Sequence, residues 1–351
     1  MDKWRDIARF LGRTLMVAAT LTPFLALYLW LDPFKVIWHY DEYYPARVKN
    51  RIELNSGYLS VANYDNHRQQ ARYDSFIFGD SRAFYFTTAD WRRYLPPGSS
   101  PYHFDGAAES LLAIERKVRY ADSHGSRLRD VLLVLDYETL SQTESSSTPY
   151  LRLPPKLSSP VGAVTFHLSQ FGQFMNPTIM RIAVDCSLHG DTKEYKSHYH
   201  LVTPHKYTFD SERNEYYYYE YEEQIEAGTY YTPSRMKAFE NAQYPDSVAP
   251  RAIRGKQARL LKSIKEVFDR HGTRCKVVIS PAYNQIRLNP ADAEALRELF
   301  GPDNVADFSG VNRWTSDYRY YYEQQHFRYC LSREILEQVY APGRERPAEG
   351  L

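Results

Sequence analysis

The segment from Thr14 to Leu31 constrains the chain most, because it contains 18 residues without a formal charge. A helix of roughly 20 apolar residues crosses the hydrocarbon core of a bilayer, which is about 30 Å thick. Basic residues precede this segment at Lys3, Arg5, Arg9 and Arg13. Because positive charge beside a span keeps that end in the cytoplasm, the sequence predicts a single-pass anchor with the rest of the chain exported.

Two other interpretations of this segment are weaker. A cleaved signal peptide needs a short apolar region that ends at small residues. Here the small residues Val17-Ala18-Ala19 come too early, and the segment ends in the bulky residues Tyr28–Leu31. A buried helix of a soluble domain has no need of the basic flank. The sequence therefore favours an uncleaved anchor, with Trp30 and Trp38 at its outer interface.

Composition narrows the remaining function classes. The chain has 351 residues, of which 43% are hydrophobic and 25% charged, a balance that supports a large core. A formal net charge of +1 provides no global attraction for nucleic acid, which we exclude as a partner. The three cysteines, Cys186, Cys275 and Cys330, exclude a disulfide scaffold. Tyrosine is abundant, at 31 residues, which suits either a sugar-binding surface or ordinary packing.

Short apolar runs alternate with helical patterns along the rest of the chain, which is typical of βα units around a parallel sheet. The clearest strands are predicted at Ser75–Phe78, Val131–Leu135 and Lys276–Ser280, and weaker strands at Tyr102–Phe104 and Asn304–Phe308. Helices are predicted at Glu109–Ser123, Ile253–Arg270 and Ala291–Phe300. The pattern predicts an α/β domain with a five-stranded parallel sheet.

The same pattern divides the chain. Residues 1–32 form the cytoplasmic end and the anchor, and 33–72 a stalk or linker with a helix somewhere in 47–63. The α/β domain covers 73–345, and 346–351 is a tail. A long insertion at 140–250, rich in Pro, Ser and Tyr, separates the third and fourth strands. An insertion of this length usually forms a lid, a small subdomain or a binding surface.

Three chemistry-bearing positions follow predicted strands. Ser81 ends a Gly-Asp-Ser triplet after the first strand, where we expect it to begin a helix. Gly106 follows the second strand and can bring a backbone N–H close to a substrate carbonyl. His326 follows the last strand, with Glu323 three residues earlier to orient its imidazole. Each feature alone suits a helix cap, a turn or a structural histidine; their order along the chain is the stronger signal.

That order resembles the SGNH/GDSL hydrolase superfamily, and specifically bacterial SGNH-like proteins with one N-terminal membrane helix. The resemblance covers about 74–339, largely without the insertion, and includes the stretches FIFGDSRAF, YHFDGAAES and YYEQQHF. It implies a three-layer α/β/α sandwich with a flavodoxin-like sheet. It also implies that Ser81 is the nucleophile, Gly106 an oxyanion glycine and His326 the base, with Glu323 in place of the usual aspartate.

The chain departs from that pattern after the third strand. The superfamily has an asparagine there that donates to the oxyanion, but this sequence reads Leu135-Asp136-Tyr137-Glu138. A carboxylate at this place repels an oxyanion unless it points away or is protonated. The oxyanion hole then depends on the N–H groups of Ser81 and Gly106, with Asn284 as a substitute donor.

We expect no metal and no cofactor. His198-Tyr199-His200 places two imidazoles on one side of a strand, but no third ligand has suitable spacing. The run Tyr216–Tyr221 suits a carbohydrate-facing surface, an interface or simple packing equally well.

The sequence and the resemblance together predict a membrane-anchored serine esterase or O-acyltransferase. It would lie in the bacterial cytoplasmic membrane, with its C-terminal domain on the periplasmic side. Its substrate would be a cell-surface polysaccharide or similar acylated glycan. The alternatives are a non-catalytic SGNH-fold scaffold, favoured by Glu138 in place of asparagine, and a carbohydrate-binding partner in envelope polysaccharide assembly.

Overall fold

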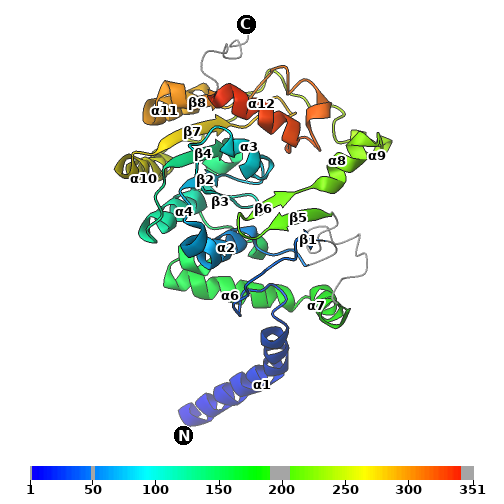
Figure 1. Ribbon diagram of the computed structural model, residues 1–351. Helices are drawn as coiled ribbons and strands as arrows, with labels where there is room; N and C mark the ends of the chain where they lie inside the picture. Colours follow the sequence, from blue (N-terminus) through cyan, green and yellow to red (C-terminus); the bar gives the residue numbers. More distant parts are fainter. Residues whose placement is uncertain (1, 49–51, 190–205, 341–351) are drawn as a thin grey trace.

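The computed structural model describes residues 2–48, 52–189 and 206–340 (Figure 1). Its centre is a five-stranded sheet in the order β3-β2-β4-β7-β8, in which every neighbouring pair is parallel. The predicted α/β class with a five-stranded parallel sheet is therefore confirmed. The strands are β2 (Ser75–Phe78), β3 (Pro101–His103), β4 (Asp130–Leu135), β7 (Arg274–Ile279) and β8 (Val305–Asp307).

Both faces of this sheet are buried. Alternate side chains of a strand point to opposite faces, so each strand contributes to two cores. Phe76 and Phe78 of β2 pack into one core, whereas Ile77 packs into another. This explains why the strands are continuous apolar runs. The first face is covered by α2 (Ser56–Ala71), α4 (Leu111–Ser123), α10 (Gly255–His271) and α11 (Pro290–Phe300), and the second by α3 (Thr88–Arg92) and α12 (Tyr329–Tyr340).

The described parts of the insertion, 140–189 and 206–250, contain helices and a small sheet. Its strands β5 (Tyr207–Asp210) and β6 (Glu215–Tyr217) form an antiparallel pair, which β1 (Arg47–Val48) extends. The helices that follow β4 are α5 (Tyr137–Ser141), α6 (Pro160–Phe174), α7 (Pro177–His189), α8 (Tyr219–Glu226) and α9 (Pro233–Met236). Single 3₁₀ turns occur at Ala83–Tyr85, Pro149–Leu151, Pro155–Leu157, Pro302–Asn304 and Tyr318–Tyr320.

The segment 33–72, which the sequence analysis assigns to a stalk, makes extensive contacts with the domain. Its helix α2 begins within the predicted range 47–63 but continues to Ala71. It buries Val61 and Tyr64 against the sheet. Tyr43 and Tyr44 pack with the insertion residue Phe209. The domain core therefore takes in residues on both sides of the predicted boundary at 73.

Helix α1 (Asp2–Leu31) projects from the base of the domain (Figure 1). Its part Trp4–Leu31 is long and apolar enough to cross a membrane, and only 6% of its most apolar stretch is buried. Pro23 lies within the helix. The prediction of an N-terminal helix able to span a bilayer is confirmed in length and composition.

Candidate functional site

Ser81 and His326, 245 positions apart, meet at the carboxyl-end rim of the sheet. The distance between Ser81 Oγ and His326 Nε2 is 2.7 Å. Ser81 follows β2, and His326 lies in the segment between β8 and α12. The geometry satisfies the separation required of a nucleophile and its general base.

A tight turn places Glu323 behind the imidazole. Glu323 Oε1 lies 2.6 Å from His326 Nδ1, and the same oxygen accepts the His326 backbone N–H at 2.8 Å. Tyr322 N–H donates to the His326 carbonyl, which closes the turn. Burial raises the pKa of Glu323, but the hydrogen bonds from His326 and the backbone outweigh it, so the net pKa lies below its ordinary value. Glu323 is thus held ionised, as the partner of an imidazolium must be.

Ser81 is positioned by the chain on either side of it. At Gly79 a Cβ would lie 2.8 Å from the Val134 carbonyl of the neighbouring strand, so only glycine allows this close approach. After Ser81 the chain forms the single 3₁₀ turn Ala83–Tyr85. The α-helix expected to begin at Ser81 is therefore absent, and no helix dipole supports an oxyanion there. Among the described residues, the Ser81 N–H has no hydrogen-bond acceptor.

Gly106 lies beside Gly79, but its N–H already donates to the Gly79 carbonyl at 3.3 Å. A Cβ at Gly106 would meet the carboxylate of Glu109, which is paired with the buried Lys117, so a side chain here requires Glu109 to move. Burial raises the pKa of Glu109, although its buried partner Lys117 opposes the rise. The Gly106 N–H can serve an oxyanion only by leaving or sharing its present acceptor.

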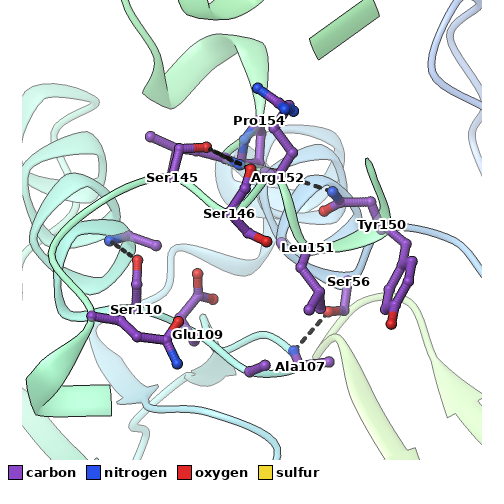
Figure 2. A pocket seen from close by; sticks show the side chains of 16 residues that line it. Ser56, Ala107, Glu109, Ser110, Ser145, Ser146, Tyr150, Leu151, Arg152 and Pro154 are labelled. Atoms are coloured by element: carbon purple, nitrogen blue, oxygen red, sulfur yellow. Dashed lines mark hydrogen bonds between the residues drawn. The ribbon is translucent and has the colours of Figure 1, made fainter. Parts of the chain in front are cut away.

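The loop after Gly106 borders a small hollow, which Figure 2 shows between Glu109 and Ser56. Ala107 N–H donates to Ser56 Oγ at 2.7 Å and ties this loop to the start of α2. The hollow of about 20 Å³ holds little more than one water molecule. It is too small for an acyl group or a sugar.

The buried guanidinium of Arg82, which follows β2, lies against the carboxylates that follow β4. Its Nη1 lies 2.7 Å from Asp80 Oδ2 and also contacts the Asp136 carboxylate, while Nη2 lies 3.5 Å from Glu138 Oε2. The carboxylates that replace the asparagine are therefore paired with a cation beside Ser81. One oxygen from each of Asp80, Asp136 and Glu138 lies within 4.8 Å of the others, and the Arg82 guanidinium contacts all three carboxylates.

Asn284 lies after β7 and lines a hollow of about 110 Å³ together with Arg82 and Glu138. Its Oδ1 accepts the Ile286 N–H at 3.1 Å, so the amide group is oriented by the backbone. Ser280, also on this lining, is 5% exposed and its hydroxyl has no partner among the described residues. The structure thus brings Asn284 to the same rim as Ser81, through the shared neighbour Arg82.

Several residues near Ser81 and His326 do not follow from the sequence patterns. Arg82 is one: three carboxylates after two neighbouring strands signal the need for a buried cation. Tyr85 is another, with its ring centroid 5.7 Å from that of His326. His103 Nδ1 lies 2.7 Å from Asp105 Oδ2 beneath Gly106, and both side chains are buried. Burial lowers the pKa of His103, but Asp105, Glu215 and a backbone hydrogen bond to Phe86 together raise it, so the net pKa is raised.

The tyrosine run packs inward where it begins. Tyr216 is buried and stacks on Phe84 with ring centroids 4.9 Å apart, while Tyr217 is 39% exposed. This observation favours the packing interpretation over a sugar-binding surface. His198 and His200 lie outside the described residues.

Comparisons with known proteins add no family to this geometry: no protein-family model matches the chain, and no curated protein matches it.

Proposed function

We propose that the protein is a membrane-anchored serine esterase or O-acyltransferase of the SGNH type. The observation that carries the proposal is the continuous chain of hydrogen bonds from Ser81 Oγ through His326 to Glu323. The strand order β3-β2-β4-β7-β8, which is 2-1-3-4-5 in chain order, supports the flavodoxin-like sheet of that superfamily.

The chemistry proceeds through an acyl-enzyme. Ser81 Oγ attacks the acyl carbonyl carbon while His326 Nε2 takes the hydroxyl proton, and the Glu323 carboxylate stabilises the imidazolium. As the carbonyl re-forms, the bond to the leaving alcohol breaks, and His326 returns the proton to that oxygen. Water or an acceptor hydroxyl then attacks the acyl-enzyme by the same proton transfers, which regenerates Ser81. Water yields hydrolysis, and a sugar hydroxyl yields acyl transfer.

The location of the protein supports an extracytoplasmic substrate. Arg5, Arg9 and Arg13 lie at the amino end of α1. On the positive-inside rule, this end faces the cytoplasm and the domain faces the periplasmic side of a bacterial cytoplasmic membrane. An acylated cell-surface glycan is the substrate class that this placement favours.

The second candidate function is a non-catalytic scaffold of the same fold. It is favoured by the oxyanion side of the site, because the Gly106 N–H is already bonded to Gly79 and carboxylates replace the usual asparagine. A scaffold needs no free oxyanion donors.

Labelling with a serine-reactive fluorophosphonate distinguishes these candidates. We expect the full-length wild type to be labelled, the Ser81→Ala variant to lose labelling completely, and His326→Gln to react at least about 10²-fold more slowly. Ser187→Ala, which removes an exposed hydroxyl on α7, should react like the wild type. Failure to label the folded wild type, or equal labelling of Ser81→Ala, would contradict the enzyme and favour the scaffold.

A further inference from the structure

Helix α6 presents an apolar stripe to its surroundings. Val161, Val164 and Leu168 are 76%, 60% and 64% exposed. Their spacing of three and four residues places them on one side of the helix. The opposite side buries Phe166 and Phe174 in a cluster with the end of α1, the segment after it and α7. The helix therefore has apolar side chains on both its inner and its outer face.

Charged residues are missing from this helix. Residues 160–174 contain no Asp, Glu, Lys or Arg, although the outer face of a helix in water normally carries them. The titratable group within it is His167, whose pKa is lowered because burial disfavours the imidazolium. An exposed apolar stripe on a helix without charged residues marks a surface that contacts a membrane or another protein.

Helix α6 lies where α1 leaves the domain. The Tyr28 ring, near the end of α1, has its centroid 5.5 Å from that of Phe171 and 5.3 Å from that of Phe174. Figure 1 shows α6 and α7 along the base of the domain, next to the upper end of α1. Trp30 and Trp38, the side chains suited to a membrane interface, are exposed at the same junction.

Hydrogen bonds at the junction between α1 and the domain fix the position of α1 relative to the chain that follows it. The Asp32 carboxylate accepts the backbone N–H groups of Val36, Ile37 and Trp38 at 2.9, 3.0 and 3.0 Å. The Trp38 indole donates to the Leu29 carbonyl at 2.8 Å. These bonds fold the chain back onto the end of α1 within a few residues.

We infer that α6 lies in the lipid–water interface of the bilayer that α1 crosses, with its apolar stripe among the upper acyl chains. The inference rests on the anchoring part of the proposed function. It commits to lipid because α6 packs against the end of α1, the helix able to cross the bilayer, and the exposed Trp30 and Trp38 lie at the same junction. A hollow of about 540 Å³ between α1 and α7, lined by Phe24, Leu27 and Met180, offers acyl chains a further contact at the same base. The domain is thereby seated on the membrane and acts on substrates close to its surface.

Photo-crosslinking of the full-length chain in phosphatidylcholine nanodiscs tests this seating. p-Benzoylphenylalanine replaces Val164, and intact-mass spectrometry measures the lipid adduct after illumination. The matched control replaces Val311, an equally apolar side chain that is 56% exposed between β8 and α12. A second control replaces Leu15, which is 70% exposed on α1. We expect a several-fold higher lipid adduct at Val164 than at Val311.

Each outcome bears on a separate step. Lipid adduct at Leu15 but no excess at Val164 would overturn the seating and leave the anchor intact. Protein–protein adduct in place of lipid adduct at Val164 would assign the stripe to a second copy of the chain and overturn it as well. Absence of lipid adduct at Leu15 would overturn the anchor and the seating together. Fluorophosphonate labelling of Ser81 in the same samples reports on the proposed chemistry independently of the seating.

Discussion

Ser81, His326 and Glu323 form the hydrogen-bonded chain on which the proposed chemistry depends. A free serine hydroxyl is a weak nucleophile, and a hydrogen bond to an imidazole held by a carboxylate is what activates it. The turn that closes between Tyr322 and His326 supplies that carboxylate from only three positions away. Arg82 has a different task, because it neutralises the Asp80 and Asp136 carboxylates beside the nucleophile.

Replacing Glu323 with glutamine should slow fluorophosphonate labelling about 10²-fold or more, because the amide cannot stabilise the imidazolium. Glu323→Asp should recover part of the rate, since it restores the charge on a shorter side chain. The rate constant for labelling is the measurement, and Glu298→Gln, an exposed carboxylate on α11, is the matched control. Equal rates for Glu323→Gln and the wild type would remove Glu323 from the proposed mechanism.

The same variant should alter how stability depends on pH. The folded-state pKa of Glu323 is lowered, so its contribution is fully present above the unfolded value, about 4.3 for glutamate. That contribution is lost as the pH falls through the lower folded-state pKa. The stability difference between wild type and Glu323→Gln, measured by denaturant unfolding, should therefore shrink only in acid. A difference that grows toward low pH would contradict the assigned ionisation.

At the scale of elements, the strand ends and the turns after them determine the site. The parallel strands bring Gly79, Gly106 and Asp136 to one rim, since all of them follow the carboxyl ends of strands. The 3₁₀ turn after Ser81 keeps the nucleophile short of any α-helix. In the proposed mechanism, oxyanion stabilisation therefore depends on individual N–H groups and not on a helix dipole.

Gly79→Ala should destabilise the protein by about 1–3 kcal/mol, because the added Cβ meets the Val134 carbonyl of β4. It should also slow labelling at Ser81, two residues away. Gly172→Ala is the matched control: a Cβ there meets nothing within 4 Å, and alanine in a helix is favoured by about 0.5–1 kcal/mol. Urea unfolding and labelling rates measure both effects, and equal stability of the two variants would contradict the close approach of β2 and β4.

At the scale of the whole molecule, the domain and the apolar helix α1 are joined by a folded junction. Residues 33–72 contribute β1 and α2 to the domain, and the insertion contributes α6 and α7 to its base. Chain segments distant in sequence thus form one layer next to α1. If α6 is seated in the interface as inferred above, this layer orients the domain relative to the membrane.

Asp32→Ala should loosen that junction, because three backbone N–H groups lose their acceptor at a cost of about 1–3 kcal/mol. Hydrogen exchange should show faster exchange at Val36, Ile37 and Trp38, while Ser81 labelling stays unchanged. Asp32→Asn keeps one acceptor oxygen and should have a smaller effect. Unchanged protection of these amides in Asp32→Ala would contradict a junction organised by this carboxylate.

Local patterns were enough to predict the apolar helix, the five strands and the order of Ser81, Gly106 and His326 along the chain. Hydrophobic periodicity and glycine positions reflect interactions between residues close in sequence. They therefore predict local structure before the tertiary fold is known. The bounds of β2 match the prediction, and the other four strands match within two residues.

Long-range contacts decided the rest. The engagement of Gly106 with Gly79, the pairing of Arg82 with Asp136 and the burial of Tyr216 each join segments far apart in sequence. The turn after Ser81 and the packing of 33–72 likewise depend on neighbours that no local pattern names. Hydrophobic periodicity predicts which side chains are buried. Which residues they pack against is decided only by the tertiary structure, because those partners are distant in sequence.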